Sequence, residues 1–328
     1  MGIPGLAPGR RAFVCAIAIG IATSWTGVAV ADDYPSKPIT LIVPFTAGGG
    51  TDQVARAFAE ALKKELGQPV TVQNLPGAGS ATGTTRLHES AADGYTLGMT
   101  GGFLVSTALR GQFKPSPLDF THLARLSQET FVLATQASAP YAKLSDYLAA
   151  SRAKPGSISI ATAGAGALTD LAAEALNQET KASLNVVNFP GGARELTAVL
   201  GGHASAGVFS QVEVLPQVGA AGGLRVLASF GETRSEKLPD APTLKELGID
   251  GVPAGPWQGI AAPKGIPDAV RAKLADAIAR AARDPQWLAF LSKSGLASSY
   301  LTGAAYDTFL HDEEKQLGGL MKSMGLMK

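Results

Sequence analysis

The chain has 328 residues, with 28 basic and 27 acidic side chains and one cysteine, Cys15. This balance excludes a typical nucleic-acid-binding protein, which presents a basic surface. Because Cys15 lies in a segment that we expect to be removed, the mature chain offers no disulfide, cysteine nucleophile or thiolate metal site.

The N-terminus has the layout of a secretory signal peptide. Met1–Arg11 ends in two arginines, Ala12–Thr26 is apolar, and small residues at Ala29 and Ala31 precede the expected cleavage point. The apolar run is shorter than the ~20 residues that span a bilayer. We therefore predict a signal peptide over residues 1–31 and a periplasmic mature protein. A retained anchor is the alternative, and Arg10-Arg11 leaves the general and twin-arginine export routes open.

Strand and helix signals alternate from residue 39 onward. The apolar run Ile39–Phe45 predicts a strand, and Val54–Leu66 predicts an amphipathic helix because apolar residues recur every fourth position. Strands at 70–74 and 95–99 and a helix at 81–90 continue the order. Strand–helix–strand units build parallel sheets.

Two extended stretches, 121–136 and 257–261, are predicted to cross between two lobes. Between them the alternation restarts, and helices at 268–283, 285–294 and 304–321 are expected to return to the first lobe. The length also favours two domains. We predict an α/β protein with lobe 1 at 32–129 plus 256–328 and lobe 2 at 130–255, each a mainly parallel sheet flanked by helices.

Glycine-rich turns follow several predicted strands. In the first, Gly48–Gly50 precede Thr51 and Asp52 at the start of a helix, so backbone N–H groups and the positive helix end can hold a carboxylate or phosphate. The turn matches no nucleotide-binding motif. For a single loop of this kind, the alternative to an anion site is a turn that only reverses the chain. Their recurrence at 76–80, 162–166 and 190–192 favours a ligand gripped between two lobes.

Catalytic and metal-binding patterns are scarce. The four histidines are scattered, no G-x-S-x-G motif occurs, and we expect no catalytic residue, metal or cofactor. Arg194 lies in the first turn of a predicted helix, where a cation opposes the helix dipole. We therefore name Arg194 as a candidate ligand contact, with a solvated ion pair to Glu195 or Glu174 as the alternative.

Motifs along the whole mature chain resemble those of one family, the Bug-type periplasmic substrate-binding proteins of tripartite tricarboxylate transporters. The matching stretches are Tyr34–Ile39, Val43–Phe45 with Gly48–Asp52, Leu66–Val70, Asn74–Gly79, Asp93–Leu97, Leu238–Thr243 with Glu246–Gly248, Ala262–Gly265 and Asp284–Pro285.

The resemblance implies a two-lobed clamp of the type II periplasmic-binding-protein kind. It would hold a small organic carboxylate through backbone amides and water, and act as a monomer that delivers it to membrane permease subunits without changing it. The implied contacts in the first lobe are Pro44, Phe45, Gly48, Gly49, Thr51, Asp52, Gly77, Gly79 and Ser80. Those in the second lobe are Thr162, Ala163, Gly164, Gly166, Phe189, Gly191 and Gly192.

Some positions depart from the family pattern. Ala167, Leu168 and Asp170 stand where hydroxyl residues and a histidine are frequent, and Phe189 stands where tyrosine is common. These residues predict a more apolar site and disfavour citrate, whereas 210–213 and the 304–325 tail resemble the tricarboxylate-type branch. The sequence therefore does not identify which carboxylate is bound. The alternative functions are a ligand-sensing co-receptor for a membrane kinase and an enzyme acting on an anionic small molecule.

Overall fold

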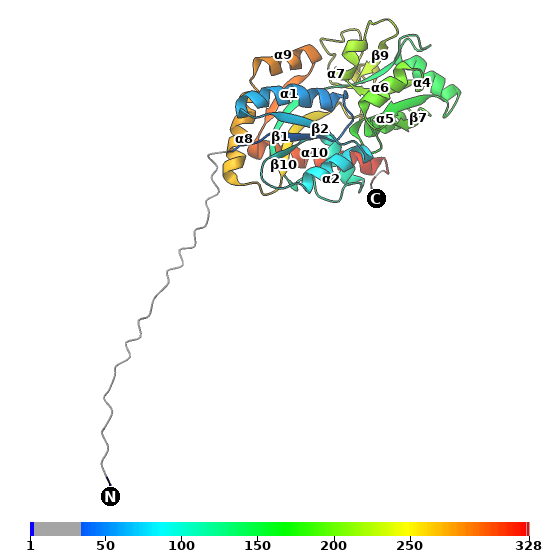
Figure 1. Ribbon diagram of the computed structural model, residues 1–328. Coiled ribbons are helices and arrows are strands. Elements are labelled where there is room, and N and C mark those ends of the chain that lie inside the picture. The colour runs from blue at the N-terminus through cyan, green and yellow to red at the C-terminus, as the bar shows by residue number, and fades with distance from the viewer. Residues whose placement is uncertain (3–33, 326, 328) are drawn as a thin grey trace.

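The computed structural model describes residues 1–2, 34–325 and 327 (Figure 1). The signal peptide predicted at 1–31 therefore lies outside the described residues, apart from its first two. The strands are β1 Ile39–Val43, β2 Val70–Asn74, β3 Thr96–Thr100, β4 Phe120–Gln128, β5 Phe131–Gln136, β6 Ser159–Thr162, β7 Asn185–Asn188, β8 Ala206–Ser210, β9 Leu224–Ser229, β10 Trp257–Pro263 and β11 Ala297–Leu301.

Helices flank these strands. They are α1 Gly50–Leu66, α2 Ala81–His88, α3 Gly102–Leu109, α4 Leu144–Ala153, α5 Leu168–Glu179, α6 Gly192–Leu200, α7 Gln211–Val214, α8 Asp268–Ala281, α9 Pro285–Ser294 and α10 Gly303–Ser323. Short 3-10 turns are η2 Ala78–Ser80, η3 Leu215–Gln217 and η4 Lys245–Leu247. Strand β11 and helix α3 were absent from the sequence prediction.

The strands form two sheets, with orders β11-β4-β10-β3-β1-β2 and β7-β6-β8-β5-β9. The expectation of mainly parallel sheets is wrong. Parallel pairing occurs between β1 and its neighbours β2 and β3, and between β6 and its neighbours β7 and β8. In contrast, β10 runs antiparallel to β3 and β4, and β5 runs antiparallel to β8 and β9. The reason is geometric, because β5 and β10 enter their sheets from the opposite lobe rather than through a helical crossover.

The first strand and helix show why the local sequence folds as it does. β1 is buried almost along its length between two parallel neighbours, which requires a continuous apolar run. In α1, Val54, Phe58 and Leu62 are fully buried at four-residue spacing. The helix ends at Gly67, whose φ of 65° is left-handed and whose N–H bonds back to Lys63.

Two connections join the sheets, β4 to β5 and β9 to β10, and they bond to each other. Glu129 N–H donates to Pro256 O at 2.9 Å and Phe131 N–H donates to Ala254 O at 3.0 Å. At Gly255 an added Cβ would lie 2.1 Å from Glu129 O, so the close approach needs glycine. The predicted boundaries at 129/130 and 255/256 fall in these connections, and the division into lobes stays a prediction.

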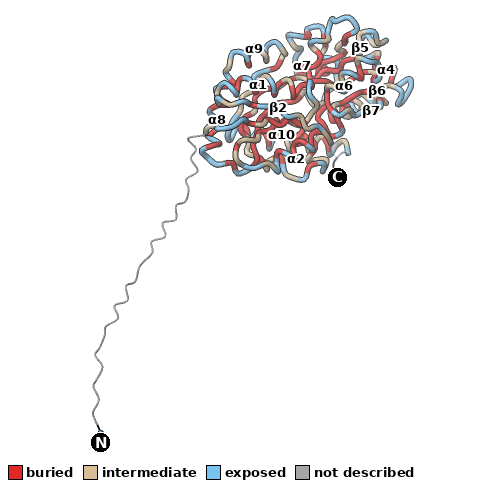
Figure 2. Tube along the Cα trace, viewed as in Figure 1, coloured by how far each residue is buried: buried red, intermediate tan, exposed pale blue. Residues whose placement is uncertain are grey.

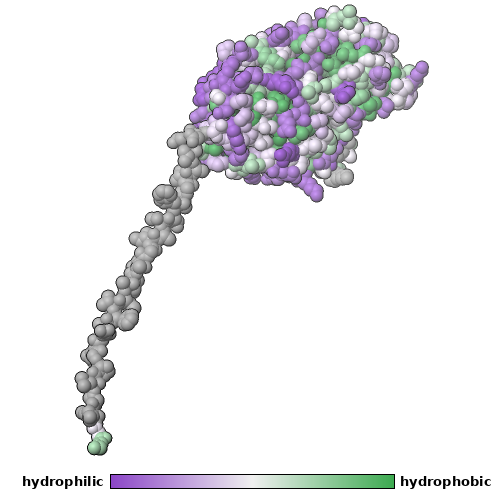
Figure 3. Space-filling view, in the orientation of Figure 1, coloured by the Kyte–Doolittle hydropathy of each residue, from purple (hydrophilic) through white to green (hydrophobic). Residues whose placement is uncertain are grey.

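Each sheet has its own core, and buried segments also run through the junction between them (Figure 2). The first core is centred on β1 and α1, where Phe58 meets Trp287 edge to face at 5.1 Å. Side chains of α3 and α10, including Val105, Leu317 and Met321, belong to the core of the second sheet. These two helices therefore tie the segments before β4 and after β10 to the second lobe. Hydrophilic residues predominate where α1 and α8 face the solvent (Figure 3).

Candidate functional site

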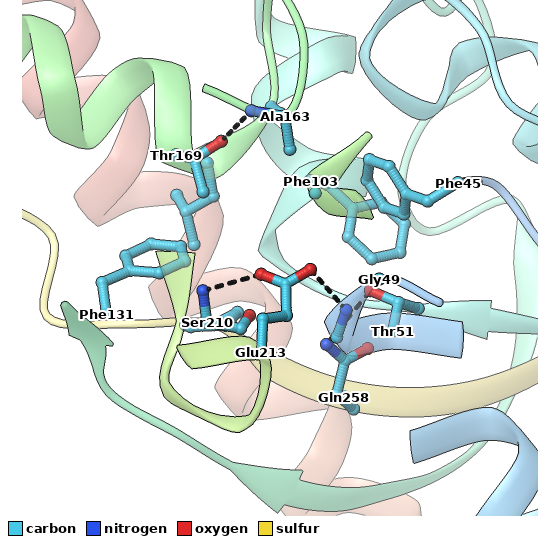
Figure 4. Close-up of a pocket in the computed structure, with 15 residues that line it drawn as sticks. Phe45, Gly49, Thr51, Phe103, Phe131, Ala163, Thr169, Ser210, Glu213 and Gln258 are labelled. Carbon is cyan, nitrogen blue, oxygen red and sulfur yellow. Dashed lines mark hydrogen bonds between the residues drawn. The ribbon is translucent and has the colours of Figure 1, made fainter. Parts of the chain in front are cut away.

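A cavity of about 50 Å³ lies between the two sheets, and we call it the cleft cavity (Figure 4). Helix starts from both sides reach it, namely the first turns of α1, α5, α6 and α7. Such starts carry unpaired N–H groups and partial positive charge. The cavity is lined by Phe45, Gly49, Gly50, Thr51, Phe103, Phe131, Ala163, Ala167, Leu168, Thr169, Gly192, Ser210, Glu213, Pro256 and Gln258.

A second cavity, of about 310 Å³, shares Phe45 and Ala163 with the first, and we call it the loop cavity. Glycine turns from both lobes form it, and its lining is Phe45, Pro76, Gly77, Ala78, Gly79, Ser80, Gln112, Ala163, Gly164, Ala165, Asn188, Phe189 and Pro190. Ser80 is 1% exposed, and its hydroxyl has no hydrogen-bond partner. A buried hydroxyl without a partner is costly unless a ligand or water completes it.

The turns of the loop cavity approach each other at backbone distance. A Cβ on Gly79 would lie 2.3 Å from the carbonyl oxygen of Ala165, across the two lobes. Gly79 also has a φ of 66°, in the left-handed region. Glycine is therefore required at this position both by conformation and by contact with the facing loop.

Ten of the predicted contacts line one of the two cavities and seven line neither. The ten are Phe45, Gly49, Thr51, Gly77, Gly79, Ser80, Ala163, Gly164, Phe189 and Gly192. The seven are Pro44, Gly48, Asp52, Thr162, Gly166, Gly191 and Arg194. The assignment of ligand contacts remains a prediction for both groups.

Several of these seven residues stabilise the glycine turns through hydrogen bonds without lining a cavity. The Asp52 carboxylate accepts hydrogen bonds from Gly48 N–H at 2.8 Å, Arg56 Nε at 2.8 Å and Asn74 Nδ2 at 2.9 Å. Burial acts to raise the pKa of Asp52, but the bonds from Arg56, Gly48 and Asn74 outweigh it and leave the pKa lowered. The carboxylate thus holds the first glycine turn in shape.

A parallel arrangement supports the turn before α5. Asp170 accepts from Gly166 N–H at 2.9 Å and pairs with Arg110, the residue that follows α3, at 3.2 Å. Thr169 accepts from Ala163 N–H at 3.0 Å (Figure 4). Arg194, by contrast, is exposed on α6 and borders neither cavity.

Among the side chains that line the cleft cavity and that the sequence prediction missed is Glu213. Its carboxylate projects into the cleft cavity and accepts from Gly50 N–H of α1 at 2.7 Å and from Ser210 N–H at 3.1 Å (Figure 4). The Ser210-x-x-Glu213 spacing is that of a capping box, which marks a helix start but does not tell which way that helix faces.

Glu213 has two buried acidic neighbours, Glu129 and Glu195. Burial raises the pKa of Glu213 to about 7, against the bonds from Gly50 and Ser210. Burial and the charge of Glu213 raise the pKa of Glu129 to about 8, and the same two causes raise that of Glu195 well above its usual range. The carboxyl groups of Glu129, Glu195 and Glu213 thus lie in one buried region, which includes part of the second lobe and its junction with the first lobe.

Residues 1–2, 34–325 and 327 contain no group of three or more His, Cys, Asp and Glu side chains arranged to hold a metal ion. No helix in this part of the chain has the length and apolar character needed to cross a membrane.

The model of the tripartite tricarboxylate transporter family receptor matches residues 54–326. Protein BugT of Bordetella pertussis is 32% identical over 314 residues, covering 94% of this chain and 96% of that protein.

Two solved structures share the fold closely. The periplasmic binding protein BugD superposes with a TM-score of 0.85 at 28% identity, covering 90% of this chain and all of the other. MatC from Rhodopseudomonas palustris, solved with bound malate, gives a TM-score of 0.80 at 27% identity and covers 88% of this chain and 99% of its own.

Proposed function

The chain belongs to the tripartite tricarboxylate transporter receptor family as a Bug-type periplasmic receptor, and we propose that it captures a small organic carboxylate between its lobes. It then delivers the solute, unchanged, to the membrane permease subunits of a tripartite transporter. The family is one of solute-binding receptors, and MatC holds malate. The protein would work in the periplasm as a monomer.

One observation carries the proposal, which is that helix starts from both lobes converge on adjoining cavities. The starts of α1, α5 and α6 reach the cleft cavity, and glycine turns that follow β2 and β6 face each other across the loop cavity. The glycine turns of the loop cavity present backbone N–H groups, which bind anions without a basic side chain, whereas Gly50 N–H at the start of α1 already bonds to Glu213. A ligand enclosed there would lose its water shell, which strengthens each hydrogen bond.

The residues proposed to contact the carboxylate are those of the prediction that border a cavity, above all Gly77, Gly79, Ser80 and Gly164. Ser80 supports this choice because its buried hydroxyl has no partner. Gly48, Asp52 and Gly166 act indirectly, through the shape of the turns.

A binding screen tests the proposal. The mature protein, from residue 32 onward, is screened by thermal shift against mono-, di- and tricarboxylates with aliphatic and aromatic bodies. A ligand at 100 times its dissociation constant stabilises the folded state by about 2.7 kcal/mol. Isothermal titration of each hit should give one site per chain, and chromatography of the recovered solute should show it unaltered. If no organic acid stabilises the protein, the proposal is wrong.

A further inference from the structure

The cleft cavity contains an acceptor that belongs to the protein. Glu213 is the one ionisable side chain among the described residues that line the two cavities, and no Lys, Arg or His stands with it there. Each of its oxygens accepts one backbone N–H. A carboxylate has about four acceptor positions, so Glu213 can still accept hydrogen bonds from a molecule in the cavity.

The surroundings of Glu213 oppose a second negative charge. The N–H of Gly50, at the start of α1, already bonds to this carboxylate. Glu129 and Glu195 are buried close enough for Glu213 to raise the pKa of both groups. Two like charges in contact repel each other, and the repulsion is stronger in a buried site than in water because the local dielectric constant is lower. A ligand carboxylate beside Glu213 would meet that repulsion without a compensating cation.

The remaining walls favour an apolar ligand body. Phe131 lies on one side of the Glu213 carboxylate, and Phe45 and Phe103 lie on the other (Figure 4). Phe45 and Phe103 meet edge to face, with ring centroids 5.0 Å apart. Leu168 of α5 completes this lining. Apolar walls of this kind bind hydrocarbon or aromatic surface and give little to a heavily charged solute.

The loop cavity is the opposite end of the site. It adjoins the cleft cavity through Phe45 and Ala163, and acidic side chains are absent from its lining among the described residues. The buried Ser80 hydroxyl there has no partner, and a hydroxyl can donate to a carboxylate. The two cavities therefore differ in chemistry, since the loop cavity can donate hydrogen bonds to a ligand and the cleft cavity accepts them.

We propose that the solute is a monocarboxylate with an apolar body and a distal hydrogen-bond donor, and that Glu213 selects the donor and excludes a second carboxylate. The carboxylate lies in the loop cavity, the body between the phenylalanine rings, and an N–H or O–H group on Glu213. This inference rests on the proposed function, because it names the chemical class of the ligand.

Isosteric ligand pairs test the selection. Terephthalate and 4-carbamoylbenzoate differ only in a carboxylate replaced by a carboxamide, and so do glutarate and its monoamide. Titration calorimetry of the wild-type protein at pH 8 should show each amide bound at least tenfold more tightly than its diacid. A diacid bound as tightly as its amide at pH 8, where Glu213 is ionised, would overturn the proposal, because the second carboxylate would then meet no repulsion from Glu213.

A pair of variants separates selection from general charge effects. Glu213→Gln should remove the preference for the amide or reverse it. Glu195→Gln removes a buried acid that borders neither cavity, and the preference should survive. An unchanged preference in Glu213→Gln, with circular dichroism showing a folded protein, would also refute the inference. If no acid of either kind binds to the wild type, the proposed function fails and this inference fails with it.

Discussion

Replacement of Gly79 by alanine should prevent the two lobes from closing fully. The added Cβ would lie 2.3 Å from Ala165 O, whereas real Cβ contacts essentially never fall below 3.0 Å, so the facing loops must separate by at least 0.7 Å. Overpacking of this kind costs about 1–3 kcal/mol. If the cost falls on the closed state alone, the dissociation constant rises between about fivefold and 150-fold.

A second glycine offers a matched control. Gly67 has a φ of 65°, against 66° for Gly79, but nothing lies within 4 Å of its added Cβ. Both alanine variants should lose about 1–2 kcal/mol of folding stability from the left-handed backbone. Only Gly79→Ala should weaken the titrated affinity for an acid found in the screen and enlarge the radius of gyration at saturating ligand.

The comparison of the two variants decides the interpretation. Equal losses of affinity in Gly79→Ala and Gly67→Ala would show that backbone strain, rather than contact across the lobes, controls binding. Unchanged affinity in Gly79→Ala would show that the loops need not meet when the solute is bound. Either result would refute the role given to the approach of Gly79 to Ala165.

Three further predictions concern stability. Arg110→Met leaves Asp170 buried without its cationic partner, and we expect urea denaturation at pH 7 to show a loss of about 3–5 kcal/mol. Because burial raises the pKa of Asp170, that loss should shrink as the pH falls and the carboxyl group becomes protonated. A loss of unfolding free energy below about 1 kcal/mol would mean that the Arg110–Asp170 ion pair is exposed to solvent. The raised pKa of Glu129, about 8, costs the wild type stability as the pH rises from about 4.5 to about 8. Glu129→Gln should therefore be more stable than the wild type at pH 8 and equal to it at pH 4.5, and equal stability at both pH values would contradict this. Phe58→Ala removes a fully buried ring in contact with Trp287 and should cost about 3–5 kcal/mol in the same assay; a cost below about 1 kcal/mol would contradict the packing.

Local periodicity was enough to predict much of the fold. β1 and α1 follow from one apolar run and one four-residue repeat that ends at a left-handed glycine. Helix α3 escaped prediction because its residues are almost all buried, which removes the polar face that marks an amphipathic helix. Strand β11 has alternation too weak to identify it, with no residue that is fully buried.

Pairing direction was not available from these patterns. A short apolar strand has the same sequence signature whether its neighbours run parallel or antiparallel. The direction of β5 and β10 depends on where the chain crosses between lobes, which is a property of the whole topology. The prediction of a two-lobed α/β fold therefore held, whereas the prediction of mainly parallel sheets did not.

The two ends of the candidate site differ in how visible they are in the sequence. The loop cavity is built from glycines, and recurrent glycines after strands indicate exposed backbone N–H groups without any knowledge of tertiary structure. The cleft cavity depends on Glu213, a residue that a capping box explains locally. Only the fold brings this carboxylate to Gly50, which is 163 positions away in the chain.

This difference bears on how one scaffold can serve different solutes. The turn that we propose to hold the carboxylate tolerates few substitutions, because an added Cβ at Gly79 or at Gly77 collides with its neighbours. The position of Glu213 carries no such backbone constraint, so another side chain there would leave the carboxylate end intact and change what the distal end accepts. Chemical selectivity should therefore vary with the residue at 213, while the requirement for at least one carboxylate stays constant.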